Sequence, residues 1–528
     1  MNAVRSRRFR FKFMALAPLL AAVALTSWAF ASPVGSSPDD DFHLASTWCA
    51  TGNVAHECQA VSDQGKRAVP GALIQGRCFA GKGELSAACL STSPHNTQNG
   101  LVATNRVNLR GFYPPLYYLS MHLFVTSNIA VSVVLMRIVN ILLFVGLATA
   151  IYVLLPARRR LSLVWGLAMT LVPLGLFLVA SNNPSGWAAI SAGTLWISLV
   201  GYFESSGARK AGLGTVAAVA TVLGAGARAD SAVYAVVAVV VAVLLTGRLN
   251  RRWLVSAILP LVLAVMAAVF YLSAKQSSVA LSGIPDRGAT HQIPWHNLLF
   301  TDFLNVPYLW AGVFGSWELG WLDTPMPAIV WVGGLGAFVA LALAGLASQS
   351  TRKLLAMAMV LGALWLIPTY TLVQSGVVVG TVVQPRYILP LVIMLGGIAL
   401  LQVDEPAFTL SKAQVVILVS MLSVANAAAL HFNMRRYITG TTVTGWDLNT
   451  AAQWWWNIPF SPMMVWAVGS LSFAAFLVVI AVGTMRVRAA AVVPHPQAAP
   501  TTAAHRAGGP PWHHRFHRDV SAGQAVTR

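Results

Sequence analysis

The 528-residue chain is 56% hydrophobic and only 10% charged, with a mean hydropathy of +0.66. A soluble globular domain carries about 25% charged residues, so the composition excludes that class and predicts an integral membrane protein. The net charge of +19 does not indicate a nucleic-acid partner, because Lys and Arg are distributed among short segments between apolar runs.

Apolar runs long enough to cross a bilayer as helices recur along the chain, and they predict an all-α membrane fold with about 12 transmembrane helices. The polytopic domain covers residues 13–484. Its predicted spans are 13–31, 129–155, 161–180, 184–203, 211–227, 231–246, 253–273, 326–348, 354–373, 387–403, 413–431 and 463–484.

Basic residues precede the first span and then recur at every second boundary, as expected for cytoplasmic loops. This pattern predicts a multi-pass plasma-membrane protein with a basic cytoplasmic N-terminus (1–12) and a disordered cytoplasmic tail (485–528). Residues 32–112, 274–325 and 432–462 become the large outer loops. The first span resembles a secretory signal that ends at Ala29-Phe30-Ala31. Its long apolar core favours an uncleaved anchor, and cleavage is the alternative.

All four cysteines lie in the outer loop 32–112: Cys49, Cys58, Cys78 and Cys89. Cysteines confined to an outward loop indicate an oxidising compartment and two disulfides. The local pairs Cys49–Cys58 and Cys78–Cys89 are favoured among the three possible connectivities. A zinc site is the disfavoured alternative, because no C-x-x-C spacing occurs.

The segment PDDDFH (38–43) directly follows the first span and concentrates three carboxylates and an imidazole at the outer membrane boundary. Clustered carboxylates raise one another's pKa, so the segment is a candidate base, a cation site or a solvated loop. Arginines suit a phosphate, and aromatic rings suit sugar faces or the bilayer interface. A lipid-phosphate-sugar donor and a hydroxyl acceptor would need carboxylates, arginines and aromatic rings together at one face.

Five motifs occur in an order that resembles an actinobacterial membrane family, the domain-of-unknown-function family 2142, over roughly residues 15–480. They are PDDDFH (38–43), YPPLYY (113–118), MRIVN (136–140), GWLDTP (320–325) and QPRYILP (384–390). More distantly, an acidic pair after the first span, a large first outer loop and a dozen helices resemble the GT-C glycosyltransferases. Those enzymes use polyprenyl-linked sugars on the outer side of the membrane.

The GT-C resemblance implies that Asp39 and Asp40 are the catalytic pair, one of them acting as general base on the acceptor hydroxyl. Arg386 would bind the donor phosphate. Position 40 is Asp where the commonest motif has Glu, so the identity of the base stays open. The remaining predicted substrate-binding residues are Asp41, His43, Tyr113, Glu318 and Asp323, the last two being equally compatible with anchoring at the interface.

The resemblance thus implies transfer of a sugar from a polyprenyl-phosphate-linked donor to a cell-envelope glycan or lipid acceptor. The implied partners are these two substrates and the membrane lipids. No cofactor or metal is predicted, and a divalent cation is the open alternative. A transporter or flippase for a lipid-linked glycan and a non-catalytic envelope-assembly subunit are the other candidate functions.

Overall fold

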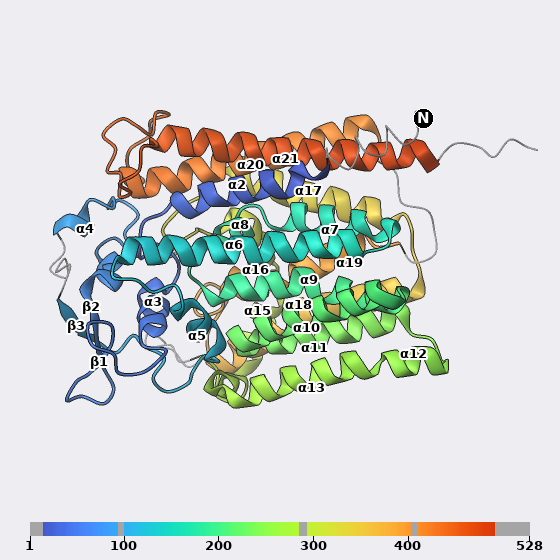
Figure 1. The fold of residues 1–528 in the computed structure, drawn as a ribbon, viewed down its shortest axis with the longest axis horizontal. Helices are drawn as coiled ribbons and strands as arrows, with labels where there is room; N and C mark the ends of the chain where they lie inside the picture. Colours follow the sequence, from blue (N-terminus) through green and yellow to red (C-terminus); the bar gives the residue numbers. More distant parts are fainter. Residues whose placement is uncertain (1–13, 93–99, 285–292, 403–409, 492–528) are drawn as a thin grey trace, which may run out of the picture.

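The computed structural model describes residues 14–92, 100–284, 293–402 and 410–491. The predicted basic segment 1–12 and the part of the predicted tail beyond residue 491 lie outside the described residues. Long helices run side by side, and loops with short elements gather at one end (Figure 1). That end carries residues 32–92 and 100–112 and is called the disulfide end below. The start of α2 and the end of α21 lie at the opposite end.

Within the described residues, nine helical segments are long and apolar enough to cross a membrane. They are α6 (Ile129–Leu154), α9 (Pro184–Glu204), α10 (Gly207–Ala227), α11 (Ala229–Thr246), the pair α12 (Arg251–Ser256) and α13 (Ile258–Ser273), α17 (Ala328–Leu346), α18 (Thr351–Ser375), α20 (Lys412–Ile438) and α21 (Pro462–Ala491). Two shorter apolar helices are α2 (Leu16–Phe30) and α19 (Pro385–Ala399). The predicted all-α membrane fold is confirmed.

The predicted span 161–180 is divided in two, because a proline interrupts it. Helix α7 (Ala157–Thr170) ends before Pro173, and α8 (Leu174–Val179) begins after it. Proline lacks an amide hydrogen and disfavours a helical conformation in the preceding residue, so a continuous helix is not expected there.

Two predicted loops hold more helix than expected. Helix α20 continues to Ile438, so Arg435 and Arg436 belong to its last turn and not to the loop 432–462. Basic side chains at a helix C-terminus interact favourably with the exposed carbonyl groups, which explains the extension. The loop 274–325 contains η3 (Lys275–Ser278), α14 (Val279–Ser282), α15 (Trp295–Asn305), α16 (Pro307–Ala311) and the π-helical turn η4 (Gly312–Ser316).

The disulfide end is built from α3 (Asp40–Trp48), the turns η1 (Gly71–Leu73) and η2 (Gln75–Cys78), α4 (Cys89–Thr92), α5 (Leu116–His122) and a small antiparallel sheet. The sheet has the order β1 (Gln59–Ala60), β2 (Arg67–Pro70), β3 (Leu101–Thr104) and was not predicted. Both predicted disulfides are confirmed, Cys49–Cys58 and Cys78–Cys89.

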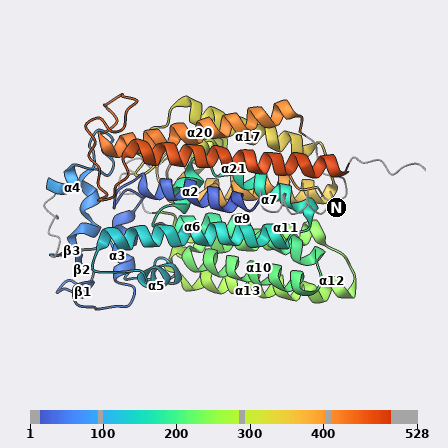
Figure 2. The same ribbon diagram turned by 45° about the horizontal axis from the view of Figure 1, so that its top comes forward.

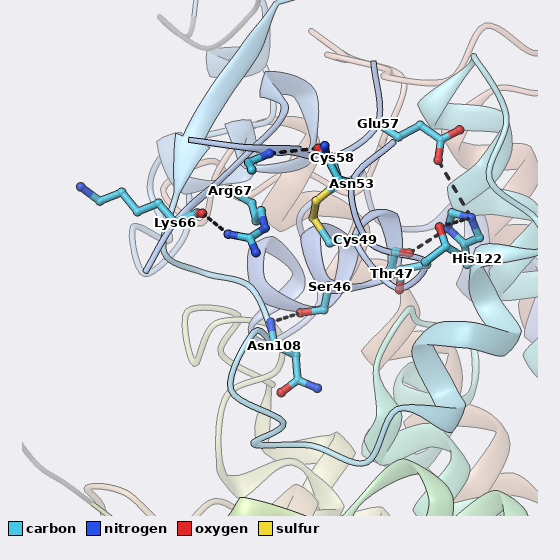
Figure 3. Close-up of a disulfide and its surroundings, with 12 residues drawn as sticks. Ser46, Thr47, Cys49, Asn53, Glu57, Cys58, Lys66, Arg67, Asn108 and His122 are labelled. Atoms are coloured by element: carbon cyan, nitrogen blue, oxygen red, sulfur yellow. Dashed lines mark hydrogen bonds and ion pairs between the residues drawn. A yellow bond between two sulfur atoms is a disulfide. The ribbon is translucent and has the colours of Figure 1, made fainter. Parts of the chain in front are cut away.

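The Cys49–Cys58 disulfide joins the end of α3 to the segment before β1 (Figure 3). Nearby, the Asn108 amide donates to Ser46 Oγ at 2.9 Å, and His122 Nδ1 lies 3.1 Å from the Thr47 carbonyl oxygen (Figure 3). Helix α3 is therefore held along its second half by the chain that follows the sheet and by α5.

The connection between α2 and α3 is bound by side chains from several distant elements. Arg137 of α6 donates to three carbonyl groups at the end of α2, those of Ala29, Ser32 and Pro33, at 2.6–3.0 Å. Three more side chains donate hydrogen bonds to backbone carbonyl groups of this connection: Trp321 to that of Gly35, Tyr437 to that of Ser36, and Asn183 to that of Pro38. Helix α2 also packs against α6 and α21. These contacts fix α2 against the rest of the bundle, and its retention as an uncleaved anchor stays a prediction.

Replacing Gly35 by alanine is expected to destabilise this connection more than an ordinary glycine substitution. Gly35 has φ +87°, and a Cβ atom there would lie 2.7 Å from Gly76 Cα. Gly52→Ala is the matched control, because Gly52 has φ +95° but open space around its Cβ position. Backbone strain of about 1–2 kcal/mol should affect both variants, and the clash only Gly35→Ala. Equal melting temperatures of the two purified variants would contradict the close approach.

Candidate functional site

Helix α3 begins at Asp40, and Asp39 is the residue that turns the chain into it. Asp39 has φ 56° and ψ 26°, and its carbonyl accepts from the amides of Phe42 and His43, both at 2.9 Å. Aspartate tolerates this left-handed conformation better than most residues. The turn places Asp39 at the junction of α3 with the helix bundle.

The Asp39 carboxylate bridges two arginines that are far apart in the sequence. Arg106 Nη2 donates to Oδ1 at 2.8 Å, and Arg386 Nη2 donates to Oδ2 at 2.7 Å. Burial on its own raises the pKa of Asp39, but the charge of Arg386 and the hydrogen bonds from both arginines outweigh it and hold the pKa well below 3.8. Because its pKa is low, this carboxylate is ionised. Because the side chain is 33% exposed, it is also accessible.

Asp41 joins α3 to the small sheet. Its carboxylate accepts from Arg77 Nε at 2.9 Å and from Arg106 Nη2 at 3.0 Å, and its side chain is 5% exposed. Burial on its own lowers the pKa of Arg106, but its bonds to Asp41 and Asp39 raise it above the usual range. The carboxylates of Asp39 and Asp41 thus share one guanidinium group.

Asp40 lies in a different environment, because it is completely buried. Its Oδ2 accepts from the Gly35 amide at 3.0 Å, and its Oδ1 has no hydrogen-bond partner among the described residues. Burial raises the pKa of Asp40 to about 7, although the charge of Arg137 opposes the increase. The predicted catalytic pair is therefore divided into an accessible Asp39 and an enclosed Asp40.

The raised pKa of Asp40 predicts a pH-dependent stability that Asp40→Asn removes. Between about pH 4 and pH 7 the folded protein binds a proton that the unfolded chain, with a pKa near 3.8, has lost. The stability contributed by Asp40 therefore falls as the pH rises through this window, by at most about 1.4 kcal/mol per pH unit. Thermal unfolding in detergent at several pH values should show wild type losing stability relative to Asp40→Asn. Asp63→Asn, at an exposed position, should follow wild type.

Aromatic side chains surround the bridged carboxylate. His43 Nδ1 lies 2.9 Å from the Tyr118 hydroxyl, and the His43 ring contacts Tyr113 edge-on at 5.4 Å between ring centroids. Burial lowers the pKa of His43 to about 3, so the imidazole is neutral at physiological pH. Burial likewise raises the pKa of Tyr113 to about 12, so its hydroxyl is protonated.

Two guanidinium groups lie near the ring of Tyr387, that of Arg386 at 5.1 Å and that of Arg228 at 4.8 Å from its centroid. Arg228 connects α10 to α11 and forms a two-bonded pair with Asp230 at 2.7–2.8 Å. It also lies 5.6 Å from the Tyr113 ring centroid, which adds it to the surroundings of the site.

Arg386 retains unused hydrogen-bonding capacity. Its Nη2 binds Asp39 and the Tyr387 hydroxyl, but its Nε and Nη1 have no hydrogen-bond partner among the described residues. The residue is only 5% exposed. A buried charged donor without an acceptor is costly, and a phosphate is the acceptor that best fits a guanidinium group. The arrangement can therefore bind an anion next to the accessible carboxylate of Asp39.

The structure brings together five of the predicted residues, Asp39, Asp41, His43, Tyr113 and Arg386. Asp323 lies elsewhere, in a buried ion pair with Arg436 at 2.6 Å, and it also accepts from the Gly81 amide. Glu318 is exposed; partial burial and the charge of Asp323 raise its pKa. Neither residue has a hydrogen bond or ion pair to Asp39 in the described part of the chain. The substrate-binding roles of both stay predictions.

Three arginines of this site were not predicted to bind the motif, namely Arg77, Arg106 and Arg228. Arg77 and Arg106 lie in the segment 32–112, where the sequence contains no signal that distinguishes them from other exposed basic residues. Among the described residues, no three His, Cys, Asp or Glu side chains form a metal-binding group. Within the acidic motif, Asp39 and Asp41 are paired with arginines.

Comparison with known proteins identifies one family. A family model described as "Predicted membrane protein (DUF2142)" matches residues 23–395. No curated protein matches the chain, and no solved structure does. The matched range includes the acidic motif and Arg386, and it ends within α19.

Proposed function

The chain belongs to the DUF2142 family of predicted membrane proteins, and from this premise we propose that it is a membrane glycosyltransferase. It moves a sugar from a polyprenyl-phosphate-linked donor to a cell-envelope glycan or lipid acceptor. The observation that carries the proposal is the contact between an accessible carboxylate and a buried arginine with two unused donor groups, Asp39 and Arg386. A carboxylate suits an acceptor hydroxyl, and a guanidinium suits a phosphate.

The donor phosphate binds Arg386 and is also drawn to the neighbouring Arg106. Together with Arg77, these arginines outnumber the carboxylates of Asp39 and Asp41, so the site has an excess positive charge for an anionic ligand. A phosphate on Arg386 competes with Asp39 for the guanidinium group. Donor binding therefore raises the pKa of Asp39 towards its ordinary value and makes it a better base.

In the transfer step, the acceptor hydroxyl oxygen forms a bond to the anomeric carbon as the bond from that carbon to the lipid phosphate oxygen breaks. The electron pair of the broken bond stays on the leaving phosphate, where the arginines stabilise the charge. The hydroxyl proton passes to the Asp39 carboxylate. The partly exposed ring of Tyr113 would contact the sugar, whereas His43 is buried and packs against that ring.

We place the disulfide end on the outer side of the plasma membrane and both termini in the cytoplasm. Disulfides form in oxidising compartments, which supports this orientation. Figure 1 shows the short helix α12, with Arg251 and Arg252, at the end opposite α3, where basic residues are expected on the cytoplasmic side. Buried charged side chains of the helices bind groups close to them; Lys353, for example, donates to the Gly345 carbonyl at 2.7 Å. This distribution favours a transferase over a transporter.

The test compares envelope glycans of a deletion strain with those of the strain complemented by wild type or by Arg386→Gln. We expect wild type to restore one missing sugar and Arg386→Gln at matched abundance to restore little of it. Accumulation of the unused polyprenyl-linked sugar on the outer leaflet would accompany loss of transfer. Its accumulation on the inner leaflet would instead indicate a flippase, and unchanged glycans in the deletion strain would contradict both functions.

A further inference from the structure

A groove of about 670 Å³ lies along α20, away from the acidic motif. Figure 2 shows α17, α20 and α21 along one edge of the bundle. The groove is bordered by α20, by Trp466 of α21, by the loop that follows α20 and by the segment 325–327 that leads into α17. Its volume falls within the range of small-molecule sites, about 300–1,000 Å³. The walls are mostly apolar, with Val424, Ala427, Ala428, Phe432 and Trp466 among the lining residues.

One end of the groove holds a buried arginine without a carboxylate partner. Arg435 lines the groove and is 5% exposed, and no carboxylate lies within 4.0 Å of it among the described residues. Its Nη2 donates to the carbonyl groups of Gly445 and Asp447, but its Nε has no hydrogen-bond partner there. The carboxylate of Asp447 is occupied by the Asn449 amide and the Thr450 hydroxyl, both at 2.9 Å.

The neighbouring Arg436 differs from Arg435, because it is also buried but forms an ion pair with Asp323 at 2.6 Å. A buried positive charge needs a negative partner, and backbone carbonyls supply only part of it. An anionic group in the groove would supply the partner that Arg435 lacks.

The aromatic residues place this anion at the membrane interface. Trp446 stacks on His431 at 5.1 Å and contacts Trp466 edge-on at 4.9 Å, and it is 65% exposed. Tryptophan is enriched at the level of the lipid headgroups. From Val424 to Arg435 the helix rises about 16 Å, so an apolar chain can lie along α20 while a headgroup reaches Arg435.

We propose that this groove binds an anionic phospholipid of the surrounding bilayer, with its phosphate on Arg435 and one acyl chain along α20. The inference is independent of the proposed transferase activity. A phospholipid fits because the groove has a charged end and apolar walls. A free phosphate would bind the charged end but leave the apolar walls exposed to solvent.

The test measures lipid binding to the full chain by native mass spectrometry after detergent exchange, with phosphatidylglycerol as the probe. We expect one retained lipid per protein in wild type. Arg435→Gln should weaken binding about tenfold or more, because a charge-assisted contact is lost. Ala428→Trp should weaken it similarly by filling the groove while Arg435 remains. Arg158→Gln, an exposed arginine that pairs with Glu204, is the control and should bind as wild type does.

The proposal is overturned if both Arg435→Gln and Ala428→Trp retain the lipid as wild type does. It is also overturned if the copurified species is a polyprenyl-linked sugar, since the occupant would then be the donor. Ala428→Trp keeps every hydrogen bond of Arg435, so loss of lipid in this variant, with an unchanged melting temperature, supports the groove even where Arg435→Gln folds poorly.

Discussion

Asp39→Asn is expected to reduce sugar transfer at least about 100-fold, because the amide cannot accept the proton of the acceptor hydroxyl. Asparagine adopts the left-handed conformation as readily as aspartate, and it keeps the size of the side chain. The variant should therefore fold and reach the membrane. The measurement is the amount of restored envelope sugar in a complemented deletion strain, normalised to the abundance of the protein in membranes.

Two matched variants complete this experiment. Asp63→Asn removes an exposed carboxylate from the same outer segment, where it pairs with Lys66, and should behave as wild type. Asp40→Asn tests the other member of the predicted pair, whose buried carboxylate accepts a hydrogen bond from the Gly35 amide. If Asp39→Asn restores the sugar completely, Asp39 belongs only to the ion-pair network and the transferase proposal loses its base.

Arg137→Met is expected to give the largest loss of stability, about 3 kcal/mol or more, since each buried carbonyl group left without a donor costs about 1–3 kcal/mol. The guanidinium group of Arg137 is 1% exposed, and it supplies the donors for three carbonyl groups at the end of α2. Methionine keeps much of the apolar volume but leaves these carbonyls without partners, and each loses a charged hydrogen bond. We expect little folded protein in membranes and a strongly lowered melting temperature of the fraction that can be purified.

The control is Arg158→Met, which removes an arginine that is 60% exposed and shares Glu204 with Arg159. Surface ion pairs contribute little, so its stability should lie close to that of wild type. An Arg137→Met protein that is as abundant and as stable as this control would show that the other donors to the connection, such as Asn183 and Tyr437, are sufficient.

The helices were largely predictable from the sequence, because each span is a local property of composition and length. The disulfides were predictable for a similar reason, since each pair closes a short loop within the segment 32–112. The division of the span at Pro173 follows from a local rule that the apolar run conceals. The extension of α20 was not predicted, because two consecutive arginines, Arg435 and Arg436, are typical of a polar loop. In the structure both side chains are buried by the loops that fold over them.

The candidate site was predictable only in part. The acidic motif and Arg386 stand out because charged residues at a membrane boundary are rare and expensive. Their partners do not stand out, since Arg106 lies 65 residues beyond Asp41 and depends on the path of β3. The different environments of Asp39 and Asp40 arise from a single left-handed residue at the start of α3. Such long-range and conformational effects leave no pattern in a single sequence.

The ion pair between Asp39 and Arg386 spans 347 residues and has a consequence for biogenesis. Asp39 emerges early in synthesis, directly after the first helix, whereas Arg386 is added only when most of the 528 residues have been translated. Until α19 inserts, the acidic segment has only its local arginines as counter-ions. Under the proposed transferase function, a nascent or truncated chain without α19 would lack the arginine that binds the donor phosphate, and competence for transfer would begin only once α19 is in place.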